Sequence, residues 1–378
     1  MSGRVVEIAA PSPTETRSGA AATLLGIGIA RPERIWPQAE LASLQERVWD
    51  LDGTARGRWR RIVERSGVVS RAIAADPSDL LHRSTPERMA IFERLAPPLA
   101  EAACANALAE AGVAPDRVTD LVVVTCTGLA APGVGSGLAG GGDLGLPRDV
   151  RQLQLAFMGC FGGIAALRTA SSLAGADPDA VVLAVCVELC SLHLRDDRDP
   201  QNLVASALFA DGAAAVVVGG REVVAADRGT AAAGSRRASL GRGRTLTLPE
   251  GREEMSWRLT EHGFAMTLSR EVPRAIEREI GGFLDAAVPS PRVVLAHPGG
   301  PGILEAVDRA VAGCDLAGRL DPRGGEIARE VLAECGNMSS ATILFVLDRA
   351  LREGLVGPFE AVAFGPGLTI DAIGLGPV

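Results

Sequence analysis

Apolar residues along this chain form two kinds of pattern, short continuous runs and longer stretches with helical spacing. The runs have the length of buried strands and lie at 24–30, 121–127, 180–187, 213–218, 293–296, 361–363 and 368–375. Helical spacing lies at 37–48, 55–66, 86–111, 202–207, 271–287, 302–312 and 339–351, and Pro97-Pro98 is expected to bend or break the third helix. This alternation predicts an α/β fold with largely parallel sheets.

Two stretches fit neither pattern. Residues 222–250 show little strand character, and we expect loops there that expose Arg236, Arg237, Arg242 and Arg244. The loop at 128–145 is rich in glycine but has no G-x-G-x-x-G or P-loop sequence at the start of a helix. Nucleotide binding by this loop therefore receives little weight.

The most informative stretch is 153–174, where a strand pattern changes into a helical one. In residues 153–157, larger apolar side chains alternate with smaller or polar ones, and in residues 164–170 the apolar side chains have helical spacing. Cys160 lies between these two patterns. Backbone N–H groups at a helix start favour a thiolate, so we expect a lowered pKa and fast alkylation at Cys160. Glycines at 159, 162 and 163 leave room for a substrate. The alternative is that Cys160 is a buried packing residue.

The chain also shows weak internal repetition. The turn from Phe209 to Gly212 returns 155 residues later as the turn from Phe364 to Gly367, and each leads into an apolar run. A predicted helix start at Asn337 likewise matches the one at Cys160. We expect two similar fused halves, 21–220 and 221–378, after a flexible segment at 1–20, with a site between the halves.

Composition narrows the function. A net charge of -8 argues against nucleic acid as a partner. Seven cysteines without a C-x-x-C pair argue for free thiols and against a zinc site. We expect a soluble cytoplasmic protein, because no secretory signal or membrane-spanning run is present. With no tyrosine and 3% aromatic residues, aliphatic, small and sulfur-containing side chains are expected to form the pocket walls.

One basic stripe stands out on this acidic chain. Arg58, Arg61 and Arg65 fall on one face of a predicted helix. They can be a solvated helix face, which the sequence alone favours, or a phosphate site suited to arginine.

Four motifs, taken together and in order, carry a resemblance to a known family. They are M-G-C-F-G-G at Cys160, A-H-P-G-G-P at His297, C-G-N-M-S-S-A at Asn337 and F-G-P-G-L-T from Phe364. From about residue 22 onward the chain resembles the type III polyketide synthases of the chalcone and stilbene synthase superfamily, in a bacterial form. The resemblance implies a thiolase-like αβαβα layered sandwich of two similar halves, a homodimer, and a coenzyme A tunnel leading to a buried site.

The resemblance also implies the chemistry. Cys160 would carry the acyl chain as a thioester, and His297 would hold the thiolate. His297 and Asn337 would stabilise the negative charge that forms when malonyl-CoA loses CO2. Malonyl-CoA and an acyl-CoA starter are the expected substrates, with no metal and no prosthetic cofactor. Alone, a histidine is more often a satisfied core residue, and an asparagine before a helix is more often a cap.

Further residues match family positions. The coenzyme A contacts would be Arg58, Arg61, Arg65, Gly299 and Gly300, which moves the basic stripe toward the phosphate interpretation. The substrate pocket would be lined by Cys126, Thr127, Cys190, Leu192, His193, Phe209, Met266, Ser339, Phe364 and Pro366. Three positions depart from the plant enzymes, Ala131 in place of Met, Ala363 in place of Gly, and Met266 or Phe264 in place of a second gatekeeper Phe. A bulky phenylpropanoid starter is therefore not expected.

His193 has two possible roles. It can face the pocket and limit chain length, or it can turn outward to Asp196 or Asp197 with a raised pKa.

The expected product is a small aromatic or pyrone secondary metabolite. An all-malonyl product such as 3,5-dihydroxyphenylacetyl-CoA is the first expectation, with tetrahydroxynaphthalene, alkylresorcinols or alkylpyrones as further possibilities. The alternatives are a β-ketoacyl-carrier-protein synthase III that condenses once, and a non-catalytic interaction protein on the same fold. A thiolase is less favoured, because its second cysteine near the C-terminus is not evident.

Overall fold

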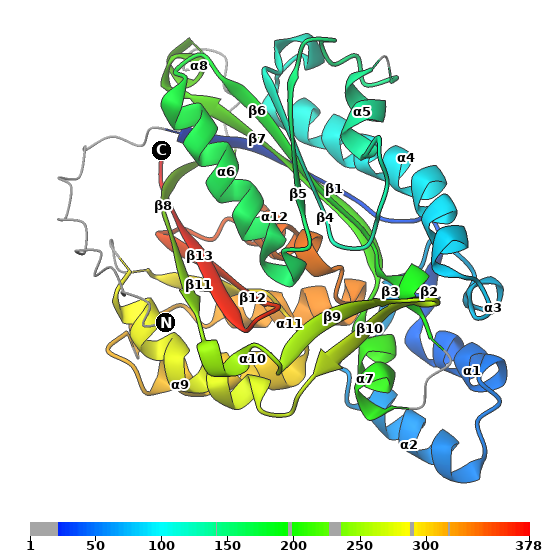
Figure 1. The fold of residues 1–378 in the computed structure, drawn as a ribbon. Coiled ribbons are helices and arrows are strands. Elements are labelled where there is room, and N and C mark those ends of the chain that lie inside the picture. Colours follow the sequence, from blue (N-terminus) through cyan, green and yellow to red (C-terminus); the bar gives the residue numbers. More distant parts are fainter. Residues whose placement is uncertain (1–21, 141, 196–198, 227–235, 288–290, 317) are drawn as a thin grey trace, which may run out of the picture.

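A computed structural model describes residues 22–140, 142–195, 199–226, 236–287, 291–316 and 318–378. Its largest feature is a nine-stranded sheet with the order β11-β12-β13-β8-β1-β7-β6-β4-β5 (Figure 1). The strands are β1 (Ala22–Ala30), β4 (Asp120–Thr125), β5 (Arg151–Ala156), β6 (Val181–Leu189), β7 (Asp211–Gly220), β8 (Ala238–Thr247), β11 (Val293–Ala296), β12 (Phe359–Gly365) and β13 (Thr369–Gly376). The predicted flexible segment at 1–20 lies outside the described residues.

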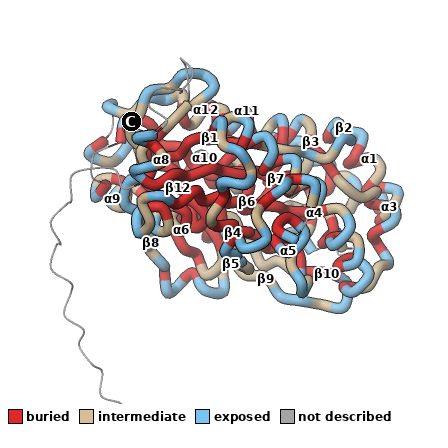
Figure 2. Tube along the Cα trace, turned by 90° about the horizontal axis from the view of Figure 1, so that it is seen from above, coloured by how far each residue is buried: buried red, intermediate tan, exposed pale blue. Residues whose placement is uncertain are grey.

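Central helices pack in one cluster with strands from both ends of this sheet, and other helices cover its outer faces, which gives the thiolase-like αβαβα sandwich of two similar halves. The larger helices are α4 (Thr85–Ala111), α6 (Gly162–Ala176), α9 (Val272–Asp285), α10 (Pro301–Ala312), α11 (Arg323–Cys335) and α12 (Thr342–Arg352). In β4, Leu121 and Val123 pack with the cluster under α4, whereas Val122 and Val124 pack with the cluster that contains α6 and α12. Because β4 is buried on both faces, its residues do not alternate between apolar and polar. Figure 2 shows such buried strands at the centre of the molecule.

The two halves share a topology. In each half a turn of 3-10 helix leads into a buried helix, η2 (Gly159–Phe161) into α6 and η5 (Ser339–Ala341) into α12. In each half a strand and its antiparallel neighbour follow, β6 with β7 and β12 with β13. The Phe209 and Phe364 turns stand before β7 and β13, as the internal repeat predicts.

Two expectations from the sequence are wrong. The sheet is mixed, because only β11·β12, β4·β5 and β4·β6 are parallel and the other described pairs are antiparallel. Part of 222–250 forms β8, which pairs with β13 and β1, so Arg244 is only partly exposed and bonds Glu360. Arg236 and Arg237 are also only partly exposed, whereas Arg242 is exposed as expected.

Helix α4 passes through Pro97 and Pro98 without a break, so of the two expected effects of the prolines, a bend or a break, the break does not occur. It begins with a capping box between Ser84 and Glu87 and ends at Gly112, whose φ is 66°. The helix lies tightly on β1, because a Cβ on Gly28 would stand 2.2 Å from the backbone N of Ala107. Pro97 and Pro98 have no N–H to donate to the preceding turn, and Ala96 and Ala100 beside them are fully buried in the core.

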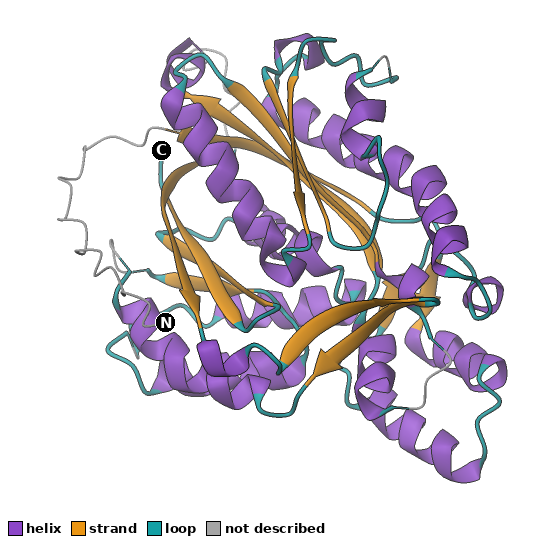
Figure 3. Cartoon of the chain, in the orientation of Figure 1, coloured by secondary structure: helices purple, strands orange, loops and turns teal. Residues whose placement is uncertain are grey.

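The remaining elements are smaller helices and strands outside the nine-stranded sheet. They are β2 (Ile35–Pro37), α1 (Gln38–Val48), α2 (Gly53–Glu64), β3 (Ser70–Ala72), α3 (Pro77–Leu80), η1 (Pro115–Arg117), α5 (Val134–Ala139), η3 (Cys190–His193), α7 (Pro200–Leu208), α8 (Arg221–Ala226), η4 (Pro249–Gly251), β9 (Met255–Thr260) and β10 (Gly263–Leu268). Strands β9 and β10 form a separate hairpin that stands apart from the large sheet (Figure 3). The hairpin matters for function, because its side chains line the cavities described next.

Candidate active site

Cys160 lies in η2, between β5 and α6, as the strand-to-helix pattern predicts. The glycines around it serve packing between the halves more than access for a substrate. Gly159 has a φ of 67°, and a Cβ there would stand 2.2 Å from Cδ of Pro366. A Cβ on Gly163 would stand 2.4 Å from the carbonyl oxygen of Ser340. The turn that carries Cys160 is therefore fixed by direct contact with the other half.

His297 and Asn337 reach the same place from the second half. His297 follows β11, and its backbone N–H donates to the carbonyl of Val362 at 2.8 Å. The backbone of Asn337 pairs with the Phe209 segment, because its N–H donates to Leu208 and its carbonyl accepts from Ala210, both at 2.9 Å. The Sγ of Cys160 lies 4.0 Å from Oδ1 of Asn337.

Burial determines the charge states of Cys160 and His297. Desolvation raises the pKa of Cys160 to about 12, against the opposing hydrogen bonds of Ser339 and Asn337. Desolvation lowers the pKa of His297 to about 3, and neither ring nitrogen has a hydrogen-bond partner among the described residues. The prediction of a lowered pKa at Cys160 is therefore wrong for the thiol when His297 carries no positive charge. Either charge is costly by itself, but a thiolate and an imidazolium formed together compensate each other.

All three side chains line one cavity of about 650 Å³, which we call the main chamber. The lining includes most of the predicted residues from the second half of the chain, and these are Met266, His297, Gly299, Gly300, Asn337, Phe364 and Pro366. Phe209 and Cys160 line it from the first half. Phe209, Phe364 and Trp257 make part of its wall aromatic, contrary to the expectation from composition.

Only one of the three arginines of the basic stripe lies at this chamber. Arg58 of α2 is part of the lining, whereas Arg61 and Arg65 lie on exposed surface outside it. Arg270, which the sequence did not indicate, lies in the lining between β10 and α9. The neighbouring Glu271 bonds Arg274 instead, at 2.9 Å. Among the described residues, neither Arg58 nor Arg270 has an ion-pair partner.

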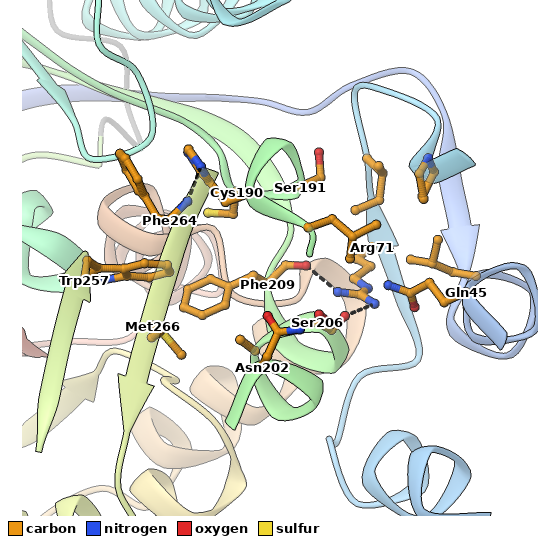
Figure 4. A pocket seen from close by; sticks show the side chains of 16 residues that line it. Gln45, Arg71, Cys190, Ser191, Asn202, Ser206, Phe209, Trp257, Phe264 and Met266 are labelled. Carbon is orange, nitrogen blue, oxygen red and sulfur yellow. Dashed lines mark hydrogen bonds between the residues drawn. The ribbon is translucent and has the colours of Figure 1, made fainter. Parts of the chain in front are cut away.

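Two predicted pocket residues lie elsewhere. Cys190 and His193 line a separate cavity of about 50 Å³, the small pocket, which Phe209 and Met266 also border (Figure 4). Arg71 is buried at this pocket and donates to the carbonyls of Phe209 and Ser206. The small pocket thus lies behind the wall of the main chamber.

Cys126 borders a third cavity of about 400 Å³, the side chamber, which Pro366 and Gly159 also line. Its Sγ accepts the N–H of Gly159 at 2.9 Å, so this thiol supports the turn that carries Cys160. Of the remaining predicted residues, Thr127, Leu192 and Ser339 line none of these three cavities.

Glu188 is a buried acid that the sequence analysis did not select. It accepts the backbone N–H of Cys126 and the hydroxyls of Thr127 and Ser340, so it joins the ends of two strands to η5. Burial raises the pKa of its carboxyl group. An acid two residues before Cys190 in an apolar strand was the available signal.

His193 takes neither of its two expected roles fully. Its Nδ1 accepts the N–H of Phe264 at 3.2 Å, so the proton lies on Nε2, 2.9 Å from the carbonyl of Thr127. The ring stacks on Phe264 with centroids 4.0 Å apart. Burial lowers the pKa of His193 to about 4, opposite to the raised value of the outward alternative, and Asp196 and Asp197 lie outside the described residues. His193 thus fastens the β9–β10 hairpin.

We expect His193→Leu to lower the free energy of unfolding by about 2–4 kcal/mol, because two buried polar groups lose their partners. Between pH 6.5 and about 4 the folded protein with neutral His193 binds fewer protons than the unfolded chain, so stability falls as the pH falls. Urea unfolding at pH 5 and pH 8 should show this pH dependence reduced in the variant. The exposed His82→Leu serves as control, and an unchanged pH dependence in His193→Leu would refute the assignment.

The fold and the Cys-His-Asn chamber define a thiolase-like protein. Two family models match the chain, the N-terminal domain of chalcone and stilbene synthases over residues 11–222 and the C-terminal domain over 242–378. The chain belongs to the chalcone and stilbene synthase family.

Relatives agree with this assignment. The chain is 29% identical to "Probable polyketide synthase 1" of Dictyostelium discoideum over 92% of its own length, but it spans only 11% of that protein. The C-terminal type III polyketide synthase domain of Steely1, a type I/III hybrid from Dictyostelium, is 28% identical with a TM-score of 0.83, covering 95% of this chain and 99% of that domain. PKS-I from the brown alga Ectocarpus siliculosus is 25% identical with a TM-score of 0.83, covering 96% and 100%.

No helix in the described part of the chain has both the length and the apolar character to cross a bilayer. Within those same residues, no group of three or more His, Cys, Asp or Glu side chains could hold a metal ion.

Proposed function

We propose that this protein is a type III polyketide synthase that extends an acyl chain on Cys160 with malonyl-CoA. The observation that carries the proposal is the convergence of Cys160, His297 and Asn337 on one chamber, whose lining also holds two arginines that have no ion-pair partner within the described part of the chain. A thiol, an imidazole and an amide supply a nucleophile, its proton acceptor and hydrogen-bond donors for an oxyanion. No prosthetic group or metal is needed for this chemistry.

The reaction proceeds in two steps. The Cys160 thiolate attacks the acyl-CoA carbonyl, forms an enzyme thioester and releases coenzyme A, which takes up the thiol proton through His297. Malonyl-CoA then loses CO2, and the carbanion attacks the enzyme thioester and expels the Cys160 thiolate. His297 and Asn337 donate to the malonyl thioester oxygen while it carries the negative charge. The product is a β-ketoacyl-CoA two carbons longer, which can be loaded again.

The arginines would hold the coenzyme A phosphates. We expect Arg58→Ala and Arg270→Ala each to raise the KM for malonyl-CoA about three- to tenfold and to leave kcat within about twofold. Contacts far from the reacting carbon bind ground state and transition state equally, and the effect should shrink at high salt. Arg61→Ala, on the same helix but outside the chamber, is the matched control. Equal effects of all three changes on kcat would count against this site.

A homodimer is the proposed assembly, supported by exposed apolar side chains around β5. This strand lies at one edge of the nine-stranded sheet, and Leu153, Phe157 and Leu259 are 43%, 56% and 61% exposed. Leu259 belongs to β9 and borders the same cavity as Phe157, and exposed apolar side chains at a free strand edge favour association. Light scattering at micromolar concentration measures the mass of the particle and so distinguishes a dimer from a monomer.

For the localisation, seven free cysteines support a reducing compartment such as the cytoplasm.

For the product, we propose an all-malonyl aromatic compound such as 3,5-dihydroxyphenylacetyl-CoA, made by an enzyme of bacterial type. The deciding experiment is mass spectrometry of products from malonyl-CoA alone, then with acyl-CoA starters. Repeated extension of free coenzyme A thioesters supports the proposal. A single condensation that requires carrier protein would support the β-ketoacyl synthase III alternative, and failure to load any acyl group on Cys160 would support a non-catalytic role.

A further inference from the structure

The side-chain amide of Asn337 is turned in a defined direction. Its Oδ1 accepts the backbone N–H of Ser339 at 2.9 Å, and the hydroxyl oxygen of Thr342 lies 3.4 Å from the same atom. A backbone N–H requires an acceptor, so this contact identifies which end of the amide is the oxygen. Asn337 also lines the main chamber. With Oδ1 occupied by the backbone, Nδ2 is the end of the amide that remains available to a substrate there.

The hydroxyl group of Thr342 fastens the backbone of residues 337–339, which we call the Asn337 turn. Its Oγ1 accepts the backbone N–H of Met338 at 2.8 Å and donates to the carbonyl of Ser339 at 3.1 Å. Thr342 is the first residue of α12 and is fully buried. It lines none of the main chamber, the small pocket and the side chamber. Any effect of Thr342 on a substrate must therefore pass through the Asn337 turn.

The Asn337 turn needs support because Ser339 has a left-handed backbone. Its φ is 49°, a conformation that residues other than glycine rarely adopt, and such a conformation persists only where the surroundings enforce it. On one side, the backbone of Asn337 is fixed by its two hydrogen bonds with the Phe209 segment. On the other side, the Thr342 hydroxyl holds both Met338 and Ser339. Together these bonds determine where the Ser339 N–H points, and hence how the amide of Asn337 is turned.

The equivalent turn in the first half is held by other means. There the residue that begins the 3-10 turn is Gly159, whose φ is 67°, in the same left-handed region as Ser339. In both halves the N–H of this residue has a side-chain acceptor, which is Sγ of Cys126 in the first and the amide oxygen in the second. Close packing of Pro366 on Gly159 fixes the first turn, whereas the hydroxyl of Thr342 fixes the second.

We propose that Thr342 is a positioning residue, whose hydroxyl holds the Asn337 turn so that Nδ2 of Asn337 is directed at the malonyl thioester oxygen. The inference rests on the proposed function, because the direction of Nδ2 matters only if negative charge forms on that oxygen. Asn337 then has both of the roles weighed from the sequence. Its Oδ1 caps the backbone at the start of η5, and this cap fixes the direction of the donor at its other end.

The test compares Thr342→Val, which keeps the side-chain shape but removes the hydroxyl, with Thr342→Ser, which keeps the hydroxyl. Decarboxylation of malonyl-CoA to acetyl-CoA is followed by liquid chromatography. We expect Thr342→Val to lower kcat about ten- to thirtyfold and to leave the KM for malonyl-CoA within about twofold, because the misdirected donor acts mainly in the transition state. Thr342→Ser should retain kcat within about threefold.

Thr119→Val is the matched control. The Thr119 hydroxyl also accepts a backbone N–H and donates to a carbonyl, both of Val181, at 3.0 and 3.1 Å. Thr119 directly precedes β4 and lines none of the three cavities. Both valine variants should lower the thermal unfolding temperature by a similar amount, because each leaves a backbone N–H without its acceptor. Only Thr342→Val should lose decarboxylation.

A double substitution separates positioning from a general loss of structure. In an Asn337→Ala background, Thr342→Val should change kcat less than about twofold, because Thr342 acts only through Asn337. The inference is overturned by a further tenfold loss in the double variant, by unchanged kcat in folded Thr342→Val, or by an equal loss in Thr119→Val. Thr342→Cys replaces the valine variant if the latter does not fold. If the unsubstituted enzyme does not decarboxylate malonyl-CoA, the proposed function fails instead, which is a different result from full activity in Thr342→Val.

Discussion

Replacing Cys160 by alanine is expected to lower product formation from malonyl-CoA at least about a thousandfold, because the atom that carries the acyl chain is lost. Asn337, His297 and the chamber would remain, so substrate binding should persist while no covalent intermediate forms. Liquid chromatography with mass spectrometry measures the product, and intact-protein mass spectrometry measures the acyl adduct.

Cys314→Ala provides the matched control. Cys160 and Cys314 are partly exposed, whereas the other five cysteines are buried. Cys314 lies beyond α10, outside the main chamber, so its loss should leave activity and acyl loading unchanged. Near-normal product yield from a folded Cys160→Ala enzyme would refute the proposed mechanism.

The secondary structure around Cys160 was predictable because it depends on residues that are close to Cys160 in the sequence. Strand alternation, then glycines, then helical spacing defined β5, η2 and α6, and Ile164 and Leu167 are fully buried as that spacing requires. The position of His297 directly after β11 followed in the same way from a short apolar run.

Pairing between distant segments was less accessible. Strand β8 contains two arginines and two glycines, which look like a loop in the sequence, but β13 supplies the backbone partners that make it a strand. The parallel prediction failed for a related reason, since β6 and β7 are antiparallel although α7 lies between them. Pairing direction depends on where a connection crosses the sheet, which a single run does not record.

The division of the pocket could not be predicted from motifs. Cys126, Cys190 and Phe209 were expected to share one cavity, but Cys126 borders the side chamber, whereas Cys190 borders the small pocket, which Phe209 shares with the main chamber. Which cavity a side chain borders depends on the position of the β9–β10 hairpin and on its register, in which Trp257 lies opposite Met266. Arg270 was missed for a simpler reason, since an arginine beside Glu271 looks like an ordinary surface pair until the structure shows Glu271 bonded to Arg274.

The second large effect is expected at His297. The thiolate, not the thiol, reacts with iodoacetamide and with acyl-CoA. With the pKa of Cys160 raised to about 12 by burial, an isolated thiol would be ionised in only about one molecule in 10⁵ at pH 7. In the proposed mechanism, the proton passes to His297, and the two charges then compensate each other. His297→Gln removes the proton acceptor but keeps a polar side chain.

We therefore expect His297→Gln to slow alkylation of Cys160 at pH 7 at least about a hundredfold and to lower kcat by a similar factor. In the His297→Gln variant, the pH dependence of alkylation is set by the ionisation of the Cys160 thiol alone. In the variant, alkylation should rise about tenfold per pH unit up to at least pH 9, because only deprotonation by solvent makes the thiolate. Mass-spectrometric alkylation rates between pH 5 and 9 measure both profiles, with the exposed His82→Gln as control. Identical profiles for native enzyme and His297→Gln would show that His297 does not take the proton from Cys160.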